Sequence, residues 1–197
     1  MLELICLRHW PTRWNAEKRL QGRCDLPLSE TSIEALQRRR IPASLTAIRW
    51  YCSPLRRARE TAELLGLGAT PEASLIEMDW GDWEGKTVLE LREADPDGMA
   101  ELEDRGLNLL PPGGESPREV LQRVSAWAEV MRLEGRQQLG AVCHKGVIRA
   151  LLAAACDWDM RGRAPEKLDY RCLQHFLWDG QRWSLGEINR PLADRMP

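Results

Sequence analysis

The sequence predicts an α/β fold, a three-layer α/β/α sandwich with a mostly parallel sheet. Two observations predict this fold. Short apolar runs that suit buried strands alternate with longer segments whose apolar residues follow helical spacing. A chain of 197 residues is also long enough to bury a sizeable core. We therefore expect a single domain over residues 1–197, with residues 78–115 inserted as a small cap or lid.

Composition and charge exclude several classes of partner. The chain has 28 basic and 30 acidic residues, so no overall field attracts nucleic acid or an anionic membrane. No window approaches the roughly 20 apolar residues of a membrane span, and no secretory leader pattern is present. The six cysteines form no C-x-x-C pair and are expected to be reduced structural thiols. We expect a cytoplasmic protein that binds neither nucleic acid nor membrane.

The first predicted strand carries the pattern on which the functional prediction depends. An apolar run over residues 4–7 ends abruptly in Arg8 and His9, and Pro11 then breaks the extended chain. Residues 14–28 lack sustained periodicity and are expected to form a loop. This arrangement delivers a charged pair to the edge of a buried sheet.

A helix and a second strand follow this loop. Ser29 or Thr31 can cap a helix that continues to about residue 39. Residues 47–52 predict the second strand. The chain therefore continues the alternation of strand and helix.

A third segment predicts a helix with an unusual concentration of positive charge. Ser53 is expected to cap it, with Pro54 at its first position and its end near residue 65. Three arginines lie in its first two turns: Arg56, Arg57 and Arg59. Because cations oppose the helix dipole at this end, the arrangement is unfavourable unless an anion binds there.

The second half of the chain repeats the pattern. Residues 74–76 predict a short third strand that ends at Glu77, and Ser116 caps a long amphipathic helix. The apolar run over residues 139–143 predicts a fourth strand, which delivers His144.

The tail differs in its periodicity. A mostly apolar helix over residues 147–156 follows the fourth strand. Alternation over residues 173–178 and 183–188 then predicts a hairpin that runs antiparallel to the rest of the sheet.

Three predicted strands thus end in ionisable residues. In open α/β sheets the carboxyl ends of the strands form the ligand crevice, so Arg8, His9, Glu77 and His144 can converge with Arg57. These residue types fit phosphoryl transfer. A neutral imidazole can attack phosphorus, guanidinium groups match the phosphoryl oxygens, and a carboxylic acid can protonate the leaving alkoxide. Glu77 is the candidate for that acid.

Several short motifs resemble those of the histidine phosphatase superfamily, also called phosphoglycerate mutase-like, whose members include alpha-ribazole phosphatases. The matching segments lie in the family's order within residues 4–152. They are Arg8-His9 with Thr12, Trp14 and Asn15; Gln21-Gly22 with residues 25–28; residues 52–58 with Thr61 and Ala62; residues 75–77 and 81–85; residues 112–116; and residues 142–149. Each motif alone is weak, and their common order makes the resemblance specific.

The resemblance implies a role for each matching residue. His9 would be the phosphorylated nucleophile, and Glu77 would act as acid and base. Arg8, Arg57 and His144 would hold the phosphoryl group. Asn15, Gln21 and Gly22 would assist on the phosphate side, and Lys145 is a further candidate for substrate binding. The substrate would be a small organic phosphate ester, and neither a metal nor an organic cofactor is implied.

The chain departs from the family pattern at three positions. Trp10 stands where the family has glycine, so either its backbone is strained or the loop follows a different path. Pro11 replaces an acidic or amide residue and removes a backbone donor. Lys145 replaces a second glycine, and its side chain either adds positive charge to the pocket or points outward.

Three functions stay open at this point. The first is hydrolysis of a phosphomonoester through a phosphohistidine. The second is phosphoryl transfer of the phosphoglycerate mutase type, for which the modest insert over residues 86–112 is short. The third is a catalytically weak phosphate-binding or scaffold domain, suggested by the altered motif positions. The sequence does not specify the substrate or the oligomeric state.

The remaining candidates have structural explanations. His175 lacks partners in the tail, and Glu84 and Glu115 are expected to fix loops, with Glu84 as a fallback proton donor. Trp80 and Trp83 are expected to pack in the core or cap. If the tryptophans near the site instead form a stacking surface, they favour a phosphate ester whose organic part contains a ring.

Overall fold

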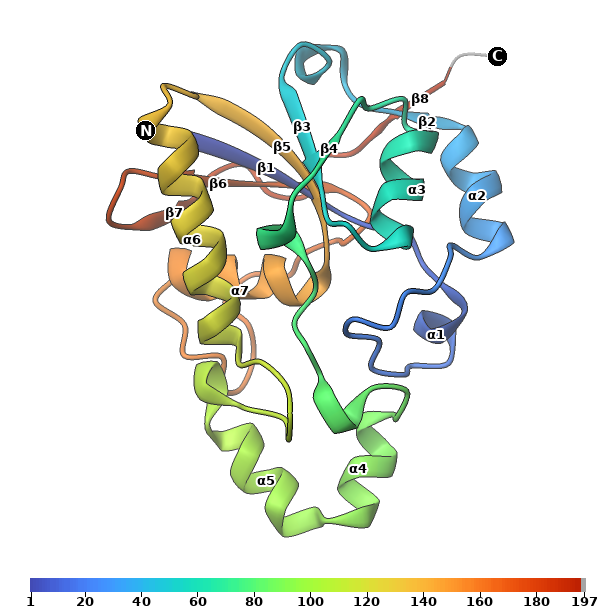
Figure 1. Cartoon of the computed structure of the whole chain (residues 1–197), viewed down its shortest axis with the longest axis vertical. Helices are drawn as coiled ribbons and strands as arrows, with labels where there is room; N and C mark the ends of the chain where they lie inside the picture. Colours follow the sequence, from blue (N-terminus) through green and yellow to red (C-terminus); the bar gives the residue numbers. More distant parts are fainter. Residues whose placement is uncertain (196–197) are drawn as a thin grey trace.

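The computed structural model describes residues 1–195 and centres on a six-stranded sheet in the order β4-β3-β5-β1-β6-β7 (Figure 1). The strands are β1 (Leu2–Arg8), β3 (Arg49–Cys52), β4 (Thr70–Pro71), β5 (Gln138–Cys143), β6 (Leu173–Trp178) and β7 (Trp183–Leu185). Strands β4, β3, β5 and β1 run parallel, whereas β6 and β7 are antiparallel to their neighbours. The mostly parallel α/β fold and the antiparallel tail are confirmed.

The helices of the described residues are α1 (Arg13–Ala16), α2 (Glu30–Gln37), α3 (Arg56–Leu64), α4 (Val88–Ala94), α5 (Pro96–Asp104), α6 (Pro117–Leu133) and α7 (Lys145–Ala155). Helices α2 and α3 pack on one face of the sheet, and α6 and α7 pack on the other. Single 3-10 turns are η1 (Ala43–Leu45), η2 (Ala73–Leu75), η3 (Gly81–Trp83) and η4 (Gly106–Asn108), and β2 (Arg39–Arg40) pairs with β8 (Ala193–Asp194). No helix within residues 1–195 is both long and apolar enough to cross a bilayer.

Alternate side chains of β1 face the two helical layers. Leu4 and Cys6 belong to a core cluster with α6 and α7, whereas Ile5 and Leu7 belong to a cluster with α2 and α3. This division follows from the pleat of a strand, in which successive side chains point to opposite faces. Because both faces are covered by helices, the middle of the strand, residues 4–7, is apolar on both faces.

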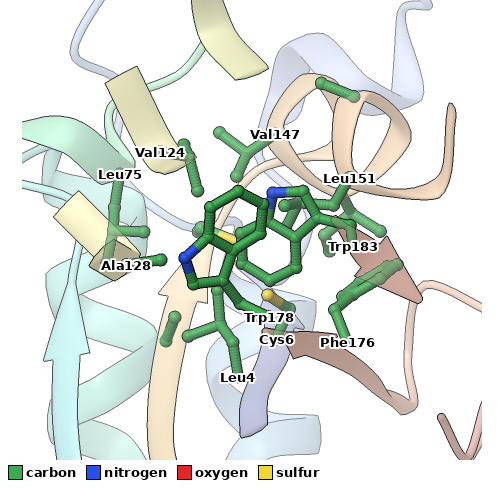
Figure 2. Packing of buried hydrophobic residues seen from close by; sticks show 14 of the residues in the cluster. Leu4, Cys6, Leu75, Val124, Ala128, Val147, Leu151, Phe176, Trp178 and Trp183 are labelled. Carbon is green, nitrogen blue, oxygen red and sulfur yellow. The ribbon is translucent and has the colours of Figure 1, made fainter. Parts of the chain in front are cut away.

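Tryptophans fill the core on the α6 and α7 side (Figure 2). The rings of Trp178 and Trp183 lie 5.0 Å apart between centroids. Their indole N–H groups donate to Glu129 and Ser125 of α6, each at 2.8 Å. The large apolar rings are thus buried without leaving these indole donors unpaired.

The strand register brings the ends of β1, β5 and β3 together. Arg8 is paired with Cys143, and the His9 backbone N–H donates to the Cys143 carbonyl oxygen at 2.9 Å. At the neighbouring strand the Ser53 N–H donates to the Val142 carbonyl oxygen at 2.9 Å. His9, His144 and Ser53 therefore emerge side by side at one edge of the sheet.

The prediction of a strand over residues 74–76 is wrong. The chain forms a 3-10 turn, η2, in which the Glu72 carboxylate accepts a hydrogen bond from the Ser74 N–H. A three-residue segment is too short for its apolar residues to distinguish a strand from a turn. Here the turn buries Leu75. Glu77 consequently reaches the site from a loop.

The expected cap of α3 is also wrong. The helix begins at Arg56, with Leu55 in the extended N-cap position. Ser53 lies before the helix, where its hydroxyl accepts a hydrogen bond from the Leu55 N–H at 3.3 Å. The same hydroxyl contacts His144.

Two smaller differences occur near the first loop. The cap of α2 is Ser29, whose hydroxyl accepts from the Ser32 N–H, so Thr31 is not the cap. The four-residue helix α1 lies across the start of the segment predicted to be entirely loop.

Helices α4 and α5 extend away from the sheet at the lower end of Figure 1. They have their own small apolar cluster, formed by Trp83, Leu91 and Met99. This arrangement is consistent with a separate packing unit over residues 78–115. Its action as a cap or lid stays a prediction.

Candidate active site

A cavity of about 1020 Å³ opens where the ends of β1 and α7 meet the segment that carries α4 and α5. Most of the predicted site residues line it. These are Arg8, His9, Asn15, Gln21, Gly22, Arg57, Glu77 and Lys145. His144 is the exception, since it is fully buried and is not among the lining residues.

The ring of His9 is held in one tautomer. Its Nδ1 atom lies 2.8 Å from the carbonyl oxygen of Trp10. A carbonyl oxygen only accepts, so Nδ1–H must donate and the lone pair resides on Nε2. Burial lowers the pKa of His9 well below its usual range, and the positive charges of Arg8 and Arg57 lower it further. His9 is therefore a neutral imidazole with a free nitrogen lone pair.

His144 lies against His9, with ring centroids 5.0 Å apart and planes inclined by 56°. Its Nε2 atom is 2.7 Å from the hydroxyl oxygen of Ser53. Burial lowers the pKa of His144, followed by the charge of Arg57. Ser53 thus fixes the orientation of a second neutral imidazole beside the first.

The guanidinium of Arg57 is buried beneath the phosphate-side loop. Its Nη2 atom donates to the Gly22 carbonyl at 2.6 Å, and its Nη1 atom donates to the Cys24 carbonyl at 2.9 Å. Neighbouring Arg56 is exposed and pairs with Glu60. Of the three arginines near the start of α3, Arg57 lines the cavity.

Glu84 holds the same loop from the other side. Its carboxylate accepts hydrogen bonds from the backbone N–H groups of Arg23 and Cys24. Gly22 has φ +48°, and a Cβ atom there would lie 1.8 Å from Glu84 Oε1. Both its backbone conformation and the close approach of Glu84 require glycine. Glu84 lies in a scaffold position.

Glu77 rests on the first turn of α7. Its Oε1 atom accepts from the Met78 N–H at 2.9 Å and from the Gly146 N–H at 3.1 Å. A Cβ atom at Gly146 would lie 2.3 Å from the same oxygen, so glycine permits this contact. Burial raises the pKa of Glu77 above the usual carboxyl value despite these hydrogen bonds and Arg57. The protonated acid is therefore favoured over a wider pH range.

Thr12 orders the two amide side chains of the site. Its backbone N–H donates to Asn15 Oδ1 at 2.9 Å, and its hydroxyl donates to Gln21 Oε1 at 3.0 Å. Because the Gln21 carbonyl oxygen faces Thr12, its amide nitrogen is left to bind another acceptor.

Five buried nitrogen atoms of the site lack a hydrogen-bond partner among the described residues. They are Arg8 Nε, Trp10 Nε1, Gln21 Nε2, Arg57 Nε and His144 Nδ1. Buried polar groups without partners are uncommon because each is unfavourable by about 1–3 kcal/mol. A concentration of them around one cavity suits a ligand rich in acceptor oxygens.

The backbone strain considered for Trp10 is absent. Trp10 is not among the non-glycine residues with positive φ. Its N–H donates to the Thr61 hydroxyl at 3.1 Å, and that hydroxyl donates to the Arg57 carbonyl at 2.7 Å. Thr61 therefore links the segment that fixes His9 to the helix that carries Arg57.

Lys145 lines the cavity, although the residue is partly exposed to solvent. Its Nζ atom lies 5.6 Å from the ring centroid of Tyr170, and the Arg8 guanidinium carbon lies 5.5 Å from the same centroid. Tyr170 and Arg149 also line the cavity. Tyr170 was missed because the segment between α7 and β6 carries no periodicity or motif.

The remaining residues lie in positions that suit the structural roles expected for them. His175 Nδ1 is 2.8 Å from Glu3 Oε1, away from the cavity. Glu115 pairs with Arg123 at 2.8 Å. Trp83 is buried in the small cluster with Leu91 and Met99, and Trp80 stacks on it with ring centroids 6.2 Å apart while lining the cavity.

The fold and the site together define an α/β protein with paired histidines and arginines at the carboxyl edge of its sheet. Comparison with known families identifies the family to which it belongs. The model of the histidine phosphatase superfamily (branch 1) matches residues 4–191, and the chain belongs to this family.

Curated relatives include proteins described as mutases. The chain is 28% identical over 193 residues to a phosphoglycerate mutase-like protein of Arabidopsis thaliana, covering 93% of this chain and 83% of the relative. It is 34% identical over 131 residues to a probable phosphoglycerate mutase of Salmonella choleraesuis, covering 64% of this chain and 61% of that protein.

Solved structures include a described phosphatase. Bacillus stearothermophilus YhfR superposes with a TM-score of 0.79 at 27% identity, covering 98% of each chain. A mycobacterial glucosyl-3-phosphoglycerate phosphatase in complex with VO3 superposes with a TM-score of 0.75 at 26% identity, covering 96% of this chain and all of that one (100%). Both phosphatases and mutase-like proteins thus resemble the chain.

Proposed function

We propose that the protein is a cofactor-independent phosphomonoester hydrolase that acts through a phosphohistidine at His9. The observation that carries this proposal is the tautomer of His9. Its Nδ1–H is engaged by the Trp10 carbonyl, which leaves a free lone pair on Nε2, and burial together with the charges of Arg8 and Arg57 keeps the ring neutral by lowering its pKa. Glu77, whose pKa is raised by burial, lines the same cavity as the candidate acid.

In the first step the Nε2 lone pair of His9 attacks phosphorus and the bond from phosphorus to the ester oxygen breaks. The departing alkoxide takes the proton of the Glu77 carboxyl. Arg8, Arg57 and His144 bind the phosphoryl oxygens, where charge is spread in the transition state. The products are the alcohol, phospho-His9 and a Glu77 carboxylate.

In the second step the Glu77 carboxylate takes a proton from water while the water oxygen attacks phosphorus. The phosphorus–nitrogen bond breaks, inorganic phosphate leaves and neutral His9 is restored. The same carboxyl group thus serves as acid and then as base, so its protonation state is reset in each cycle.

Cavity size favours hydrolysis over mutase chemistry. A mutase must retain its phosphorylated intermediate in a closed, water-free pocket. The cavity here is about 1020 Å³, at the upper end of the roughly 300–1,000 Å³ that accommodates drug-sized ligands. Water can therefore reach phospho-His9 beside a small substrate. Because the similar proteins include a named phosphatase and mutase-like proteins alike, this choice rests on the cavity.

A panel of phosphate esters, with released phosphate as the readout, tests this proposal beside a phosphoglycerate mutase assay. We expect release of phosphate from at least one ester and no transfer between positions of phosphoglycerate. Transfer without net release would establish the mutase alternative. Binding of phosphate without turnover of any ester would establish a non-catalytic phosphate-binding domain.

A further inference from the structure

The cavity carries far more positive charge than one phosphoryl group requires. Eight basic side chains line it, against two carboxyl groups, although the whole chain has a net charge of -2. Arg92 is paired with Glu103 at 2.8 Å and Arg19 with Glu17 at 3.0 Å. Six basic side chains then remain beside Glu77, the carboxyl group assigned to proton transfer. The excess is therefore a local property of this cavity.

Two of these basic side chains lie on one face of α7. Lys145 and Arg149 are four residues apart on this helix, so their side chains lie on the same face, and both line the cavity. Like charges at this spacing destabilise a helix. Lys145 also occupies the first helical position, where the dipole opposes a cation. No acidic residue lies in this first turn.

Arg8 brings a third positive charge beside Lys145 and Tyr170. Its guanidinium and the Lys145 ammonium lie 5.5 and 5.6 Å from the Tyr170 ring centroid. Burial lowers the pKa of Lys145, and Arg8 and Arg149 lower it further. Among the described residues, neither Lys145 nor Arg149 forms an ion pair with a carboxylate, and the carboxyl group that influences Lys145 is that of Glu77.

We propose that Lys145, Arg149 and Tyr170 form a second anion subsite, which selects phosphate esters that carry another negatively charged group. The inference rests on the proposed function, because it assigns the first anion subsite to the transferred phosphoryl group. Arg8 and Arg57 bind that group, and Lys145 and Arg149 bind a carboxylate or a second phosphate on the leaving alcohol. The Tyr170 hydroxyl can donate to the same acceptor oxygens.

Matched esters that differ only in this second charge test the subsite. Glycerol 3-phosphate and 3-phosphoglycerate differ by a hydroxymethyl group against a carboxylate. Fructose 6-phosphate and fructose 1,6-bisphosphate differ by one phosphate. We expect the more highly charged member of at least one pair to have about tenfold higher kcat/KM, the effect of one charge-assisted hydrogen bond. A preference within the first pair would show that the subsite binds a carboxylate, and a preference within the second pair would show that it binds a phosphate.

Substitution of Lys145 then locates the effect. In K145M the ratio of kcat/KM within the responding pair should fall about tenfold. K145R should retain it. K167M is the matched control, because Lys167 is an exposed lysine outside the cavity whose loss changes the net charge equally. If K145M lowers both members of a pair equally, Lys145 binds the transferred phosphoryl group and the subsite is refuted.

Binding to the H9A variant separates this inference from the proposed function. Calorimetric Kd values for the same pairs do not require turnover, and we expect the same preference and the same loss when K145M is added. Hydrolysis without any preference would refute the subsite and leave the phosphatase proposal intact. A Lys145-dependent preference in binding without hydrolysis by the wild-type protein would refute the phosphatase proposal and leave the subsite intact.

Discussion

The Nε2 atom of His144 and the hydroxyl oxygen of Ser53 lie 2.7 Å apart in the interior of the protein, and neither side chain is exposed. The contact joins the ends of β5 and β3, which are adjacent in the sheet. It holds the second histidine against His9. Ser53 is therefore a positioning residue.

Replacement of Ser53 by alanine should lower kcat by about 10- to 100-fold with little change in KM. The reason is that a buried imidazole nitrogen without its partner is destabilised by about 1–3 kcal/mol and loses its fixed orientation. Steady-state kinetics with an aryl phosphate measures the effect. S184A is the control, since Ser184 is exposed on β7. An unchanged kcat in S53A would show that His144 needs no support.

Replacement of Glu77 by glutamine should affect esters according to their leaving group. An alkyl phosphate needs a proton on its departing oxygen, so its rate should fall by about 10²- to 10⁴-fold. A nitrophenyl phosphate leaves as a stable anion and should lose much less. E84Q should affect the two esters equally, because Glu84 holds the loop at Arg23 and Cys24. The reverse pattern would assign the acid to Glu84.

The pH dependence of kcat/KM should be bell-shaped. The active form has neutral His9 and protonated Glu77. Burial lowers the pKa of His9, so activity should decline on the acid side only below the usual value of about 6.5. Burial raises the pKa of Glu77, so the alkaline decline should occur above the usual value of about 4.3. The alkaline limb should disappear in E77Q, and its persistence would assign it to another group.

Arg57 and Arg56 provide a matched pair of neighbouring arginines. R57M removes the buried guanidinium that supports Gly22 and Cys24 and is assigned to the phosphoryl group. We expect kcat/KM to fall at least 100-fold, or about 2.7 kcal/mol of transition-state stabilisation. R56M loses an exposed pair with Glu60 and should remain within about twofold. Equal losses in the two variants would exclude a specific role for Arg57.

Much of the fold and the placement of the site were predictable, because strong local patterns coincide with sheet geometry. The apolar runs that precede His9 and His144 are long enough to predict strands, and parallel strands end at one edge. Glu77 was predicted from its place after an expected strand. The buried position of Arg57 depended on the family motif, since nothing local distinguishes Arg57 from Arg56.

Other features depend on contacts between distant residues. Ser53 followed by proline has the local pattern of a helix cap, but the outcome is decided by His144, 91 residues away. Glu77 lies in the site although the predicted strand before it is a 3-10 turn. Tyr170 lies in an irregular segment whose path depends on packing, so no sequence pattern identified it.

The most direct test of the central claim is detection of phosphate on His9. The enzyme is mixed with an aryl phosphate, quenched rapidly, digested with trypsin and examined for acid-labile, base-stable phosphate by mass spectrometry. Because Arg8 and Arg13 flank it, His9 lies on a different tryptic peptide from His144. We predict label on the peptide of residues 9–13 and none in H9A. Stoichiometric labelling of H9A, or label only on His144, would contradict the account.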